Sequence, residues 1–172
     1  TFAATNYNKS TMNDYRILVV DDEEDLCEIL KFNLEMEGYT VDTAYSAEEA
    51  LKLDITQYNL LLLDVMMGEI SGFKMARMLK ANKDTAEIPI IFCTARDSED
   101  DMVMGLNLGA DDYIVKPYTI RNVIARVKSV LRRTANHKSH TPIEKPNILR
   151  VEGLQLDLEF KRCTIDGTEV KL

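Results

Sequence analysis

Short apolar runs that alternate with helical patterns constrain the fold of this chain more than any other feature. Five runs have the length and composition of buried strands, at 17–20, 41–44, 60–63, 89–93 and 113–115. Helical patterns follow them at 26–34, from 46, at 72–80, 98–108 and 120–131. Five βα units predict an α/β fold with a parallel sheet covered on both faces. Right-handed crossovers favour a doubly wound sheet with the strand order 2-1-3-4-5.

The two ends of the chain have a different character. Residues 1–13 are polar and lack the apolar core of a signal peptide, so we expect a disordered N-terminal extension. Residues 135–147 hold two prolines and both histidines among few apolar residues, which indicates a linker. From Ile148 apolar residues alternate with polar ones, and Asp166-Gly167 is a tight hairpin signal. The last segment, 148–172, therefore predicts a short antiparallel β fragment.

Composition excludes some classes of protein. The net charge is −8, which disfavours non-specific binding of nucleic acid by the chain as a whole. No apolar run is long enough to span a membrane. Cys27, Cys93 and Cys163 lie far apart and form no CxxC pair. We interpret them as small buried side chains in a reducing compartment, and we expect a cytoplasmic protein.

Polar residues stand where the predicted strands end. The first strand is followed by Asp21 and Asp22, and the third by Asp64. Thr94 follows the fourth strand and Lys116 the fifth. The carboxyl ends of parallel strands share one edge of the sheet, where such folds bind ligands. We therefore expect these five side chains to lie close together.

This set of side chains suits phosphoryl transfer to a carboxylate. Three neighbouring carboxylates need a cation, and hard oxygen ligands in an open site suit Mg²⁺. An ionised carboxylate beside the metal can act as a nucleophile, while Thr94 and Lys116 can contact phosphoryl oxygens. Taken singly, each residue has a simpler interpretation, because a lone Asp after a strand is usually a turn former or helix cap. Asp22 or Asp25, for example, would then cap the first helix.

Four motifs resemble the receiver domains of two-component response regulators, over about residues 15–133. They are Leu18-Val19-Val20-Asp21-Asp22-Glu23, Leu62-Leu63-Asp64-Val65-Met66-Met67, Thr94-Ala95-Arg96 and Gly109-Ala110-Asp111-Asp112-Tyr113-Ile114-Val115-Lys116-Pro117. The tail after Ile148 resembles the start of the winged-helix effector of the OmpR/PhoB type. The resemblance implies a receiver domain at 14–134 and, at 148–172, the N-terminal β-strands of a truncated DNA-binding domain.

The resemblance also implies roles for the residues at the sheet edge. Asp64 would be phosphorylated by a sensor histidine kinase. Asp21, Asp22, Asp64 and the backbone carbonyl of Met66 would bind Mg²⁺. Thr94, Ala95 and Lys116 would contact the phosphoryl group, and Thr94 and Tyr113 would form the switch. Tyr113 has an alternative resting role as a surface aromatic residue on the sheet edge.

Self-dephosphorylation in this family depends on the positions that Met66 and Arg96 occupy here. Neither side chain positions an attacking water well, so we expect a long-lived phosphoryl form. We accordingly expect a phosphoryl acceptor with at most slow self-dephosphorylation, and not an enzyme.

Members of this class dimerise through the fourth helix, fifth strand and fifth helix. Residues 97–112 contain acids and no Lys or Arg, whereas 119–135 contain bases and no acid. A two-fold contact can place one set against the other, although charge runs are often simply solvated. The resemblance implies these interface residues: Asp111, Asp112, Arg126, Val103, Leu106 and Ile124.

The sequence thus indicates a phosphorylation-controlled transcription regulator that dimerises. DNA would be bound by the full-length parent protein and not by this fragment, and no membrane is involved. Three alternatives stay open. One is a Mg²⁺-dependent phosphatase with an Asp nucleophile, although that class carries its nucleophile after the first strand. The others are a flavodoxin-like binding module and a degenerate receiver that only binds proteins.

Overall fold

The computed structural model describes residues 14–138, 148–151, 154–157, 162–165 and 168–170. The chain divides into two compact units, 1–134 and 135–172, which are described separately. The predicted N-terminal extension at 1–13 and residues 139–147 of the predicted linker lie outside the described residues.

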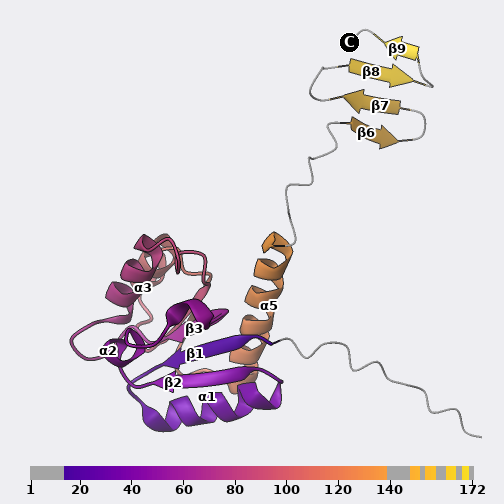
Figure 1. Ribbon diagram of the computed structural model, residues 1–172. Helices are drawn as coiled ribbons and strands as arrows, with labels where there is room; N and C mark the ends of the chain where they lie inside the picture. The colour runs from indigo at the N-terminus through magenta and orange to yellow at the C-terminus, as the bar shows by residue number, and fades with distance from the viewer. Residues whose placement is uncertain (1–13, 139–147, 152–153, 158–161, 166–167, 171–172) are drawn as a thin grey trace, which may run out of the picture. The chain divides into compact units, whose positions relative to one another are not determined.

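The first unit is built on a five-stranded parallel sheet with the order β2-β1-β3-β4-β5 (Figure 1). Its strands are β1 (Arg16–Val20), β2 (Thr40–Ala44), β3 (Leu60–Leu63), β4 (Ile90–Thr94) and β5 (Asp112–Val115). The predicted fold class and strand order are confirmed. β3 coincides with its predicted run, and the ends of the other strands differ from the prediction by at most one residue, because pairing with a neighbour, and not the apolar run itself, sets where a strand ends.

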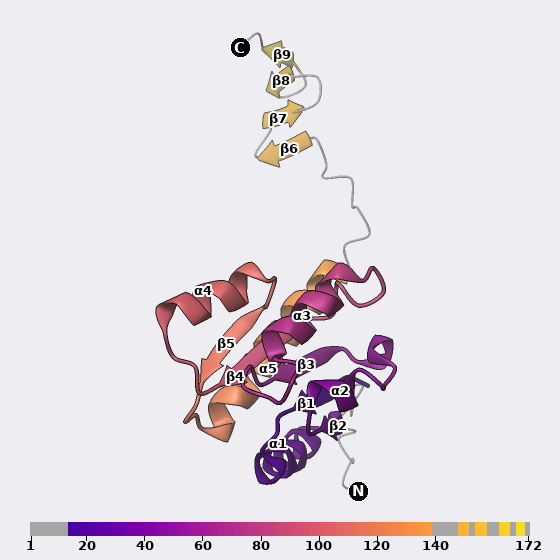
Figure 2. The same cartoon turned by 90° about the vertical axis from the view of Figure 1, so that its left-hand side faces the viewer.

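Five helices cover the sheet: α1 (Glu24–Met36), α2 (Ala47–Ala50), α3 (Gly72–Ala81), α4 (Glu99–Asn107) and α5 (Ile120–Lys138). A 3₁₀ turn, η1 (Ile55–Gln57), precedes β3. Ser46, Ser71 and Ser98 cap α2, α3 and α4, since each side chain accepts the backbone N–H three residues later. Figure 2 shows α1 and α5 on one face of the sheet and α2, α3 and α4 on the other.

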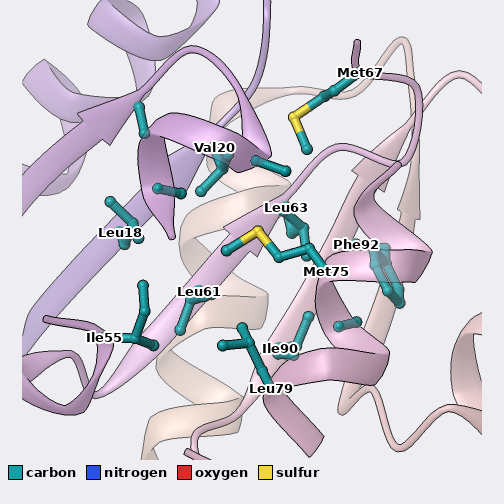
Figure 3. Packing of buried hydrophobic residues seen from close by; sticks show 14 of the residues in the cluster. Leu18, Val20, Ile55, Leu61, Leu63, Met67, Met75, Leu79, Ile90 and Phe92 are labelled. Carbon is teal, nitrogen blue, oxygen red and sulfur yellow. The ribbon is translucent and has the colours of Figure 1, made fainter. Parts of the chain in front are cut away.

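Strand residues alternate between two apolar layers, which is why the strands are apolar along their whole length. Leu18, Leu61 and Leu63 belong to the layer under α2 and α3, which also contains Met75 and Phe92 (Figure 3). Residues next to them in the strands belong to the layer under α1 and α5. All four leucines of β3 are buried. This central strand is therefore fixed from both faces, and so is the residue that follows it.

Helix α5 continues to Lys138, into the stretch 135–147 that was predicted as linker. The Thr134 hydroxyl donates to the carbonyls of Val130 and Leu131, and no proline interrupts the helix before Pro142. In the described part of the chain, no helix combines the length and apolar character that crossing a bilayer requires.

The second unit contains a four-stranded antiparallel sheet with the order β6-β7-β8-β9. Its strands are β6 (Ile148–Val151), β7 (Leu154–Asp157), β8 (Arg162–Ile165) and β9 (Thr168–Val170). β8 and β9 pair on either side of Asp166-Gly167, as the hairpin signal predicts, although that dipeptide itself lies outside the described residues. The predicted antiparallel β fragment is present.

Candidate functional site

Backbone hydrogen bonds fix the residues that follow the strands. The N–H of Asp21 donates to the carbonyl of Ala44 over 3.2 Å, and that of Asp64 to the carbonyl of Val20 over 2.9 Å. The N–H of Lys116 donates to the carbonyl of Thr94 over 2.8 Å. Each bond continues the ladder of the sheet by one step. The site is therefore held by the sheet itself, at the carboxyl edge that the sequence predicts.

One oxygen of each buried carboxylate is occupied by a local turn. Asp21 Oδ1 accepts the N–H of Glu23 over 3.0 Å, and Asp64 Oδ1 accepts the N–H of Met66 over 3.1 Å. These contacts fix both side chains in one orientation. The second oxygen of each carboxylate, Oδ2, faces Lys116. The turns thus leave one oxygen per carboxylate for the chemistry of the site.

Asp21, Asp22 and Asp64 form a cluster in which one ligand atom from each lies within 4.8 Å of the others. Asp21 and Asp64 are buried, at 2% and 4% exposed, whereas Asp22 is exposed. A set of three carboxylate oxygens with one side open to solvent fits Mg²⁺, which prefers oxygen ligands and retains water. The three residues predicted to form this site therefore lie together in the structure. The part assigned to the carbonyl of Met66 stays a prediction; its side chain is exposed.

Lys116 lies between the acids. Its Nζ is 2.7 Å from Asp21 Oδ2, 2.8 Å from Glu23 Oε1 and 3.5 Å from Asp64 Oδ2. Burial by itself lowers the pKa of Lys116, but the hydrogen bonds to Asp21 and Glu23 outweigh it and raise that pKa above its usual range. The site therefore favours the charged form of Lys116. Burial also raises the pKa of Asp21, an effect that the hydrogen bond from Lys116 opposes.

Thr94 is fully buried at the end of β4, and its hydroxyl oxygen accepts the N–H of Arg96 over 3.3 Å. The hydroxyl of Tyr113 donates to the carbonyl of Arg96 over 2.9 Å, so the loop after β4 connects the two predicted switch residues. The Tyr113 ring is half-buried, 6.0 Å from the ring of Phe92. Ala95 is exposed and lines a cleft with Lys116. The roles of these residues stay predictions.

The simpler interpretation, in which Asp22 or Asp25 merely caps α1, is wrong, because neither residue occupies the N-cap position. The N-cap of α1 is Glu23, and no side chain makes a capping hydrogen bond there. Asp21 instead accepts the N–H of Glu23, which precedes the helix. Asp22 is part of the acidic cluster.

Two glycines at close contacts, Gly72 and Gly105, were missed in the sequence. A Cβ on Gly72 would lie 2.0 Å from the carbonyl oxygen of Asp64, so only glycine allows α3 to start directly behind Asp64. A Cβ on Gly105 would lie 2.9 Å from the Tyr113 ring. The only signal in the sequence was the presence of a glycine within each helical pattern. Glycine is unfavourable in a helix, so its presence can indicate a close contact that leaves no room for a Cβ.

The residues predicted for a dimer interface lie on α4, β5 and α5, except for Asp111, which directly precedes β5. Val103 and Leu106 are about half exposed, at 50% and 49%, and form an apolar surface on α4. Arg126 Nη1 is 2.9 Å from both carboxylate oxygens of Asp112 within the same chain. The carboxylate of Asp111 accepts the N–H of Ile90. Ile124 is half-buried against the core.

The described cysteine side chains, Cys27 and Cys93, are buried and free. Burial, together with the smaller effect of the nearby charge of Asp21, raises the pKa of Cys27 to about 12. Burial likewise raises the pKa of Cys93 far above its usual range. These two thiols are poor nucleophiles, which agrees with the interpretation as small buried side chains.

Residues 17–128 match the response regulator receiver domain family. The chain is a response regulator of the OmpR/PhoB type. It is 41% identical to the transcriptional regulatory protein ResD of Bacillus subtilis over 164 residues, which are 93% of this chain and 66% of that protein. It is 43% identical to the phosphate regulon transcriptional regulatory protein PhoB of Pseudomonas aeruginosa over 157 residues, 91% of this chain and 66% of that one.

A solved structure of a CheY-like response regulator receiver domain protein from Methanospirillum hungatei has the same fold. Its TM-score is 0.66 at 33% sequence identity, and the match covers 73% of this response regulator and 99% of that chain. The fold and the family are therefore shown by independent comparisons. The chain spans about two thirds of the length of the curated relatives that it matches.

Proposed function

We propose that this response regulator accepts a phosphoryl group on Asp64 from a sensor histidine kinase, with Mg²⁺ bound. In this transfer Asp64 Oδ2 attacks the phosphorus of the phosphohistidine, so that an O–P bond forms while the P–N bond breaks. The proposal depends mainly on one observation. Asp21, Asp22 and Asp64 present ligand atoms within 4.8 Å of one another, and Lys116 Nζ lies 3.5 Å from Asp64.

The side chains of the site divide the work. Asp21, Asp22 and Asp64, with the carbonyl of Met66, hold the cation, which offsets negative charge on the transferred group. Asp64 is presented by a buried strand and oriented by the N–H of Met66. Thr94 and Lys116 supply a hydroxyl and a positive charge for the phosphoryl oxygens, and Ala95 lies beside them.

Phosphorylation then acts on the face formed by α4, β5 and α5. Tyr113 connects the loop after Thr94 to this face, because its hydroxyl donates to the carbonyl of Arg96 and its ring lies against Gly105 of α4. We propose that a shift of Thr94 toward the phosphoryl group releases Tyr113. The face then pairs with that of a second copy through the charged and apolar residues described above.

For the whole protein we propose control of transcription through a DNA-binding domain, in the cytoplasm. The β6–β9 sheet would be the beginning of that domain, and this fragment would not bind DNA specifically. We further propose that the chain is not an enzyme, since Met66 and Arg96 offer no group that activates a water efficiently. The phosphoryl form is accordingly expected to be long-lived.

Intact-mass measurement after incubation with Mg²⁺ and acetyl phosphate tests the proposal. We expect a gain of one phosphoryl group that is lost in Asp64→Ala and after addition of EDTA. Asp84→Ala is a matched control, because Asp84 is an exposed acid in the loop before β4, at the opposite end of the strands. If neither the natural chain nor the control gains mass, the protein is a degenerate receiver that only binds other proteins.

A further inference from the structure

Glu23 occupies an unusual position at the start of α1. It is the N-cap residue, yet its side chain makes no capping hydrogen bond. Its backbone carbonyl accepts the N–H groups of Leu26 and Cys27, and its own N–H donates to Asp21. The backbone thus meets the needs of the helix end, and the carboxylate is free to reach elsewhere.

The carboxylate of Glu23 reaches Lys116 across the cleft. Glu23 Oε1 is 2.8 Å from Lys116 Nζ, whereas the acceptor carboxylate of Asp64 is 3.5 Å away. Asp21, at 2.7 Å, is the other close partner. In the unphosphorylated protein, the lysine therefore bonds more closely to two other acids than to the acceptor.

Asp21 and Glu23, the two close partners of Lys116, differ in how a bound cation affects them. Asp21 is a buried member of the acidic cluster, so a bound cation competes with Lys116 for it. Glu23 is mostly exposed, with 63% of its side chain accessible, and does not belong to that cluster. Its contact with Lys116 must be broken by the phosphoryl group itself.

We propose that Glu23 is a positioning residue that holds Lys116 away from Asp64 and so weakens capture of the phosphoryl group. The inference rests on the proposed function of Asp64. Glu23 sets the resting position of Lys116, and the incoming phosphoryl group has to compete with the Glu23 carboxylate for the ammonium group. Removing the carboxylate therefore makes the site a better acceptor.

The test measures two binding constants in the whole chain. The first is the affinity for Mg²⁺ alone, and the second is the affinity for beryllofluoride, an analogue of the phosphoryl group, at saturating Mg²⁺. Both are measured by isothermal titration calorimetry for the natural chain, Glu23→Gln, Glu23→Asp and Glu24→Gln. Glu24→Gln is the matched control, since Glu24 is the exposed neighbour and the structure shows no contact from it to Lys116.

We expect Glu23→Gln to bind beryllofluoride about two- to five-fold more tightly than the natural chain, as an exposed ion pair warrants. Glu24→Gln removes the same charge but leaves the beryllofluoride affinity unchanged. Both Gln variants are expected to bind Mg²⁺ slightly more weakly, because both lose one negative charge. Only loss of the contact between Glu23 and Lys116 is expected to change the affinity for beryllofluoride. Glu23→Asp keeps the charge but is too short for the contact, so it behaves like Glu23→Gln.

Three results would overturn the proposal. Equal beryllofluoride affinities for the two Gln variants would show that the contact between Glu23 and Lys116 has no effect of its own on capture. A Glu23→Asp variant with the affinity of the natural chain would lead to the same conclusion. Failure of the natural chain itself to bind beryllofluoride with Mg²⁺ would instead overturn the proposed function, and this inference with it.

Discussion

Tyr118 has a buried hydroxyl that, among the described residues, has no hydrogen-bond partner. The ring packs against the apolar layer under α1 and α5, and burial raises the pKa of this tyrosine above its usual range. Leaving a buried hydroxyl without a partner costs about 1–3 kcal/mol. Phenylalanine keeps the ring and removes only the oxygen. We therefore predict that Tyr118→Phe raises the free energy of unfolding by about 1–2 kcal/mol.

Two further Tyr→Phe changes calibrate the measurement. The buried hydroxyl of Tyr58 donates to Asp42 over 2.9 Å, so Tyr58→Phe is expected to cost about 1 kcal/mol. The hydroxyl of Tyr45 makes only an exposed 3.4 Å contact to Glu28, so Tyr45→Phe should be close to neutral. Urea unfolding followed by far-ultraviolet circular dichroism gives all three values. This probe is suitable because the chain has no tryptophan.

The order of the three variants decides the outcome. The reasoning requires Tyr118→Phe to be the most stable of the set and Tyr58→Phe the least stable. If Tyr118→Phe loses as much stability as Tyr58→Phe, the Tyr118 hydroxyl has a partner in solution, such as a buried water. The assumption of an unpaired hydroxyl would then be refuted.

Two other predictions concern stability. Gly72→Ala places a Cβ 2.0 Å from the carbonyl oxygen of Asp64 and should cost about 2–3 kcal/mol in urea unfolding, with slower phosphorylation by acetyl phosphate. Gly68→Ala is its control, because no atom of the described residues lies within 4 Å of a Cβ there, and an equal loss in both would refute the steric argument. Burial and the hydrogen bond to Asp42 raise the pKa of Tyr58 to about 12 from its usual value of 10.0. The folded state therefore holds this proton more tightly, so the stability advantage over Tyr58→Phe should be full below pH 10 and shrink toward pH 12. An advantage that stays constant across this window would contradict the assignment.

The sequence by itself determined the fold class and the strand order. Runs such as Leu60–Leu63 are apolar at every position because α/β sheets are covered on both faces. This pattern lies within a few consecutive residues, so it can be recognised in the sequence. The residues after the strands, above all Asp21 and Asp64, were placed on one edge by topology alone. Parallel strands end on a common edge whatever the side chains between them, so these residues needed no distances to be found.

Only the tertiary structure determined which hydrogen bonds and ion pairs the polar side chains form. Glu23 and Lys116 are separated by 93 positions in the chain, and their contact depends on how the start of α1 faces the loop after β5. The tight contact at Gly72 and the unpaired hydroxyl of Tyr118 are equally invisible in a pattern of apolar and polar residues. Periodicity specifies which face of an element is buried. Contacts of a few ångströms between distant segments depend on the packing of whole elements, which periodicity does not specify.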